Sequence, residues 1–138
     1  MEEIKRLELE KRANIVRKDI INIIYKAQSG HPGGSLSITD ILTYLYFEEM
    51  KNIDVNDIKK LDRDRLILSK GHCAPALYSI LKEKGYFNNS LLTDFRQING
   101  ILQGHPDMKY IPGIDMTTGS LGQGLSVSVR NVFSWKNR

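Results

Sequence analysis

Three histidines, each directly after a glycine, are the residues of this 138-residue sequence best suited to chemistry. They lie in the segments SGHPGGS, SKGHCAP and QGHPD, as His31, His72 and His105. A glycine lets the backbone approach a ligand closely, and imidazole offers a donor and an acceptor near neutral pH. A single loop histidine is more often structural than functional. The same context three times favours a shared polar cleft that handles hydroxyls, protons or phosphate oxygens.

A metal site is the alternative use of the same residues, with Cys73 as a further ligand. No pair among them has the close spacing of a helical or knuckle-type zinc site. The sequence therefore favours the cleft over the metal.

A glycine-rich segment near the end, TTGSLGQGL at 117–125, predicts an anion site. It places glycines and hydroxyls before a helix expected to start near Ser120. Free backbone N–H groups and the helix dipole favour phosphate at such a position. Many helices begin with serine and glycine for capping alone, so the segment by itself leaves both interpretations open.

The amino-acid composition limits the classes of molecule that this protein is expected to bind. Lysine and arginine outnumber aspartate and glutamate by 20 to 16, and the charges are interspersed. This indicates a mildly basic, solvated surface that also suits an anionic substrate such as a sugar phosphate. No basic run with interleaved aromatic residues is present, so we expect no nucleic-acid partner. The charged N-terminus and the lack of a long apolar stretch predict a cytoplasmic protein without a membrane span.

The periodicity of the chain is mostly helical. Residues 4–28 predict one amphipathic helix ended by Ser29-Gly30, and GHPGGS predicts turns without regular structure. A second helix is expected near Ser37, capped by its hydroxyl. The apolar face of the first helix comprises Ala13, Val16, Ile20, Ile23 and Ala27.

Leu66-Ile67-Leu68 predicts one buried parallel strand, since it is short, apolar and bounded by charge and glycine. Pro75 then marks the start of a helix that Gly85 ends. Residues 90–98 predict a short helix. Residues 99–119 predict a long loop, of the length that is usually functional inside a compact domain.

Four motifs in this order, SGHPGGSLS, LSKGHCAPALYSIL, GHPD and DMTTGSLGQGLSVSV, resemble the N-terminal half of transketolase in its two-polypeptide form. The resemblance covers residues 10–129. It implies an α/β fold: the N-terminal part of the thiamine diphosphate-binding fold, mostly helical here, with one strand and an incomplete sheet. It also implies transfer of a two-carbon ketol unit from a ketose phosphate to an aldose phosphate, with thiamine diphosphate as cofactor.

The resemblance also implies roles for particular residues. His31 matches a histidine that binds substrate and handles protons, and His105 one that contacts the ketose hydroxyls. His72 matches a histidine near both the cofactor diphosphate and the reacting carbon. Residues 119–121 match the segment lying against the cofactor: Gly119, Ser120, where proline is usual, and Leu121.

Magnesium on the diphosphate is implied as well, but the family's G-D-G motif and later asparagine are absent from this sequence. We expect the metal ligands, and most strands of the sheet, beyond residue 138. The implied partner is the C-terminal transketolase subunit, which carries the acid that activates the aminopyrimidine. An incomplete sheet should also leave apolar helix faces exposed, with marginal stability and association into oligomers.

The last residues depart from the family pattern, which continues as V-G-M-x-x-A-x-K. Written in A/T-rich codons and read with one base removed, VRNVFSWKNR becomes V-G-M-F-L-A-G-K-I. The single codon of Trp135 forces a glycine codon in that frame. We therefore interpret residues 1–138 as a partial domain and 130–138 as a frameshifted tail. A short protein with a divergent helix end and a programmed slip are the alternatives.

Two functions follow from these observations. One is a subunit of a two-chain transketolase. The other is a non-catalytic fragment that binds only a phosphate ligand or a partner subunit.

Overall fold

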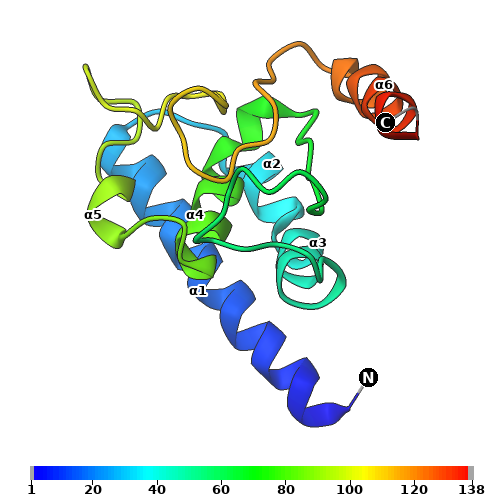
Figure 1. Ribbon diagram of the computed structural model, residues 1–138. Coiled ribbons are helices and arrows are strands. Elements are labelled where there is room, and N and C mark those ends of the chain that lie inside the picture. The colour runs from blue at the N-terminus through cyan, green and yellow to red at the C-terminus, as the bar shows by residue number, and fades with distance from the viewer. Residues whose placement is uncertain (1, 137–138) are drawn as a thin grey trace.

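The regular elements of this chain are helical (Figure 1). The computed structural model describes residues 2–136, and none of these lies in a β-strand. The longer helices are α1 (Glu3–Ala27), α4 (Ala74–Lys84) and α6 (Gln123–Lys136). The shorter elements are α2 (Pro32–Ser37), α3 (Thr39–Tyr44), the π-helical turn η1 (Leu45–Glu49), the 3₁₀ turn η2 (Gly71–Cys73) and α5 (Asn89–Leu92).

Helix α1 forms one wall of the core and packs against α2, α3 and α4, while its N-terminal end projects from the body (Figure 1). The predicted apolar face is confirmed, since Ala13, Val16, Ile20 and Ile23 are buried. The helix stops one residue earlier than predicted. Gln28, with a φ of 49°, supplies the left-handed cap that the sequence assigned to Gly30.

Helix α4 is the centre of the core. Every residue from Ala74 to Leu81 is buried, which is typical of a helix covered on all sides. Pro75 lies in its first turn, where the missing N–H costs nothing, and Gly85 ends it with a φ of 98°. Both predicted boundaries are confirmed. They matter for function because η2, which carries His72, leads directly into this rigid helix.

The segment around the first histidine was predicted wrongly in part. Residues Pro32–Ser37 form α2 rather than irregular turns, because packing on α4 and η2 outweighs the low helix propensity of glycine. The Ser37 hydroxyl donates to the Gly34 carbonyl at 2.9 Å and caps no helix. The next helix, α3, therefore begins at Thr39. Helix α5 is also shorter than the predicted 90–98.

The predicted strand at Leu66–Leu68 is wrong for the described part of the chain. The segment has no regular structure although Leu68 is buried, and among residues 2–136 no neighbouring strand is present to form a ladder. Its first N–H, on Leu66, instead donates to the Asp115 carboxylate at 2.7 Å. The α/β class expected from the resemblance is thus represented here by helices alone.

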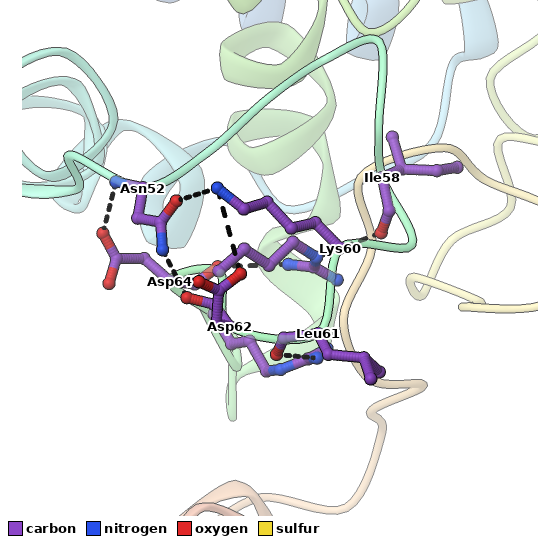
Figure 2. A network of polar contacts seen from close by, with 8 residues as sticks. Asn52, Ile58, Lys60, Leu61, Asp62 and Asp64 are labelled. Atoms are coloured by element: carbon purple, nitrogen blue, oxygen red, sulfur yellow. Dashed lines mark hydrogen bonds and ion pairs between the residues drawn. The ribbon is translucent and has the colours of Figure 1, made fainter.

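A polar network organises the irregular segment that precedes Leu66. Asn52 lies at its centre: its N–H donates to Asp64 at 2.9 Å, and its side-chain oxygen accepts from Lys60 at 2.7 Å (Figure 2). Near the end of the segment, Arg63 forms a buried ion pair with Asp115. Through Asp115, the network and the Leu66 segment are joined to the 99–119 loop.

Helix α6 lies apart from the other helices (Figure 1). It carries the exposed apolar residues that the sequence predicted, with Leu125 72% and Phe133 63% exposed. Of the proposed frameshifted tail, residues 130–136 continue this helix, and 137–138 lie outside the described residues. Within residues 2–136, no helix combines the length and apolar character needed to cross a bilayer.

Candidate functional site

The three histidines come from three different parts of the fold. His31 immediately precedes α2, and His72 is the middle residue of η2. His105 lies in the long predicted loop, which is confirmed to contain no regular element between α5 and α6. His31 and His105 are exposed, whereas His72 is half-buried.

His31 and His72 meet directly. Their ring centroids are 5.1 Å apart in an edge-on arrangement. The close packing of α2 on η2 explains this proximity, because a Cβ on Gly34 would lie 2.6 Å from the Cys73 sulfur and 3.4 Å from Nε2 of His72. Glycine at 34 is therefore required for the two histidine loops to touch.

Lys70 locks the same pair of loops together. Its ammonium donates to the Gly34 carbonyl at 2.8 Å and to the Ser37 hydroxyl at 3.1 Å. A single cation next to His72 thus holds α2 against η2. The sequence reasoning did not select Lys70, although its place in SKGH was the signal that pointed to it.

The glycine-rich segment 117–124 contacts the His72 turn at a second glycine, Gly71. A Cβ on Gly71 would lie 2.7 Å from the backbone oxygen of Thr118. The Thr118 hydroxyl donates to the Leu68 carbonyl at 2.8 Å, which holds the two segments at that distance. Gly71 is therefore the contact point between the His72 turn and the predicted anion segment.

His105 lies beside the same segment. A Cβ built on Gly119 would be 3.9 Å from Cδ2 of His105. The buried Tyr78 anchors the backbone of the His105 loop. Its hydroxyl lies 2.8 Å from the Gln103 carbonyl and 3.1 Å from the His105 carbonyl. Burial raises the pKa of Tyr78, so this hydroxyl remains a donor across the physiological range.

Two cavities adjoin these residues. One of about 190 Å³ is lined by 116–120 and the start of α6, including Gly119, Ser120 and Gln123. Another of about 720 Å³ is lined by His105, Asp107 and Thr117. Gly119, Ser120 and Leu121 themselves are exposed.

The start of α6 differs from the prediction. The helix begins at Gln123 rather than near Ser120, and its first N–H groups already have acceptors. Gln123 donates to the Ser120 carbonyl at 3.4 Å, and Gly124 to the Ser69 hydroxyl at 3.2 Å. The first N–H groups of the observed helix, on Gln123 and Gly124, are thus engaged by weak internal bonds.

The electrostatic surroundings of His72 favour its neutral form. Burial is the largest cause of a lowered pKa, followed by the positive charge available to His31, Lys70 and His105. A neutral imidazole at neutral pH can accept a hydrogen bond or a proton. Near pH 7, the His72 ring is therefore available as a hydrogen-bond acceptor.

This shift gives a pH prediction. Because the folded pKa of His72 lies below its unfolded value, the unfolded chain binds more protons in the interval between the two. Stability should fall as the pH drops below about 6.5, the ordinary histidine value. NMR titration should show His72 titrating at lower pH than the histidines of the urea-unfolded chain. His31→Gln should raise the His72 pKa only in part, since burial remains. In the wild type, a His72 pKa in the folded chain equal to or above that in the unfolded chain would contradict the assignment.

The metal interpretation finds no support. Within residues 2–136, no group of three histidine, cysteine, aspartate or glutamate side chains is arranged to hold a metal ion. Cys73 is fully buried, and its pKa is raised mainly by burial, which keeps the thiol protonated.

Residues 9–137 match the family described as "Transketolase, thiamine diphosphate binding domain". The chain is 49% identical over 125 residues to the 6-deoxy-6-sulfo-D-fructose transketolase subunit SqwG of Clostridium sp. (strain MSTE9). It is 42% identical over 127 residues to one subunit of the apulose-4-phosphate transketolase of Phocaeicola vulgatus. These alignments cover 91% and 92% of this chain but 45% and 44% of the relatives, so the chain spans less than half of their length.

The solved structures agree with these relatives. The transketolase from Leishmania mexicana superposes with a TM-score of 0.81 at 36% identity. That alignment covers 86% of this chain and 18% of the larger protein.

Proposed function

The chain belongs to the transketolase family, and on that premise we propose that it contributes the diphosphate-side half of a thiamine diphosphate site in a two-subunit transketolase. The reaction would be transfer of a two-carbon ketol unit from a ketose phosphate to an aldose phosphate, in the cytoplasm. The observation that carries the proposal is the meeting of the His31, His72 and 117–124 segments through Gly34 and Gly71.

The donor set suits an anionic, hydroxyl-rich ligand. The exposed residues Gly119 and Ser120 line the 190 Å³ cavity, Leu121 follows them in the chain and is also exposed, and His72 lies beside Lys70 on the adjoining turn. We assign His72 and residues 119–121 to the cofactor. When bound, thiamine diphosphate supplies an electron sink for breaking a carbon–carbon bond.

The histidines supply the proton handling that such a reaction needs. We assign His31 and His105, both exposed, to the sugar hydroxyls of the substrate. His72, with its lowered pKa, would accept a proton close to where the cofactor and substrate meet. Together these side chains would hold a ketose phosphate and move protons on and off its oxygens.

Magnesium does not fit the described residues by themselves. The lining of the cavity at 116–120 contains no carboxylate, and Mg²⁺ is ordinarily held by one or two carboxylates together with phosphate oxygens. We therefore propose that its protein ligands come from outside residues 1–138, and we assign no step to the metal.

The proposed partner is a C-terminal transketolase subunit, because two relatives are named as subunits. A higher oligomer of the two-chain unit fits the exposed apolar face of α6. The partner would supply the acid that activates the cofactor ring.

The test combines binding with turnover. The chain is mixed with a C-terminal subunit, Mg²⁺ and thiamine diphosphate, and cofactor binding is followed by calorimetry and ketol transfer by a coupled assay. Saturable binding that supports transfer is the expected result. Binding without transfer would instead identify a non-catalytic, phosphate-binding module, and absence of both would refute the proposal for this chain.

A further inference from the structure

Arg96 connects two of the histidine loops, and we propose that its guanidinium positions His31 and His105 relative to each other. What the two histidines then do rests on the proposed function. The positioning itself rests on contacts to Ser29 and Gly104, which precede the two histidines in their loops.

The contact with the first loop is a short hydrogen bond. Nη1 of Arg96 donates to the Ser29 hydroxyl at 2.6 Å, across 67 positions of sequence. Ser29 lies between the end of α1 and His31, where the chain has no helical bonds of its own to fix it. The guanidinium therefore ties the approach to His31 to the region that follows α5.

The contact with the third loop is steric. A Cβ on Gly104 would lie 2.7 Å from Nη2 of Arg96 and 2.9 Å from its Cζ and Nε. The guanidinium thus occupies the space beside the residue that directly precedes His105. The backbone N–H of Arg96 also donates to the Leu102 carbonyl at 2.9 Å, which anchors the same loop two residues earlier.

Two features of Arg96 cost stability, so stability alone does not account for its placement. Its φ is 57°, in the left-handed region that non-glycine residues rarely adopt. Its Nε is buried and, within the part of the chain that the structure describes, has no acceptor. The buried Phe95 ring, 5.7 Å from Cζ, packs beside the guanidinium and helps to hold it there.

The test uses the three histidines as probes, since each gives its own imidazole NMR signal. Arg96→Ala should move the His31 and His105 signals by more than one linewidth and the His72 signal by less. Gly104→Ala should move the same two signals, because the new methyl group would displace the guanidinium from Ser29. The double variant should show no more change than Arg96→Ala alone. Arg6→Ala, on the exposed face of α1, is the control and should move none.

Unchanged His31 and His105 signals in Arg96→Ala would overturn the proposal. Equal movement of all three signals would also overturn it, because that pattern marks a general loosening of the fold. If Arg96→Ala does not fold, Ser29→Ala decides: it should shift His31, and an unmoved signal refutes the connection. No cofactor is present in these measurements, so failure of thiamine diphosphate binding would count against the proposed function and leave this inference standing.

Discussion

Replacing His72 by alanine is expected to lower ketol transfer by about 100- to 10,000-fold, the range typical of losing a positioned acid–base group. His72 is the residue that contacts both other parts of the site: its ring lies 5.1 Å from that of His31, and its turn touches Thr118 through Gly71. Its lowered pKa also keeps its imidazole neutral, and so able to accept a proton, near pH 7. The loss should appear mainly in kcat, measured with saturating cofactor and the partner subunit.

The matched control is Lys59→Ala, an exposed residue of the irregular segment before Leu66. It should leave both kcat and the melting temperature unchanged. Full activity in His72→Ala, with the fold intact by circular dichroism, would remove His72 from the proposed chemistry.

Asp115→Ala should have the largest effect on stability, about 3–5 kcal/mol, because it leaves a nearly buried arginine without its counterion. The side chains of Asp115 and Arg63 are only 3% and 10% exposed. The same carboxylate also accepts the N–H of Leu66 at 2.7 Å. Such a loss is a large part of the total stability of about 5–15 kcal/mol typical of a domain, so urea unfolding should show a greatly reduced midpoint.

Two variants give this prediction its controls. Asp115→Asn keeps the acceptor for Leu66 but removes the charge. Its free energy of unfolding should therefore lie between those of the wild type and of Asp115→Ala. Asp62→Ala removes an exposed carboxylate 3.8 Å from Lys60 and should cost no more than about 0.5 kcal/mol. Equal losses of stability in Asp115→Ala and Asp62→Ala would show that the buried ion pair contributes no more to stability than an exposed one.

The spacing of apolar residues and the positions of proline and glycine predicted two of the long helices well. The spacing of Val16, Ile20 and Ile23 predicted the buried face of α1, and Pro75 and Gly85 predicted the bounds of α4. These signals are local: each depends on a period or on the backbone of a single residue. The Gly-His context identified one glycine at a contact between segments, since a Cβ on Gly71 would meet Thr118, but the contact between His31 and His72 depends on Gly34.

The errors occur where distant partners decide the outcome. Leu66–Leu68 has the composition of a strand, but a strand needs a neighbour, and among residues 2–136 its N–H finds a carboxylate instead. Residues 32–37 have the composition of a turn, yet packing makes them helical. Lys70 and Arg96 gave no periodic signal, since their partners lie 36 and 67 positions away.

The most direct test of the central claim is a thiamine diphosphate titration followed at the three imidazole NMR signals, with Mg²⁺ and a C-terminal subunit present. If the histidine loops and residues 119–121 form one cofactor site, the His72 signal should shift saturably, and thiamine without its phosphates should have a much smaller effect. Imidazole signals that stay in place through a full titration would contradict the account.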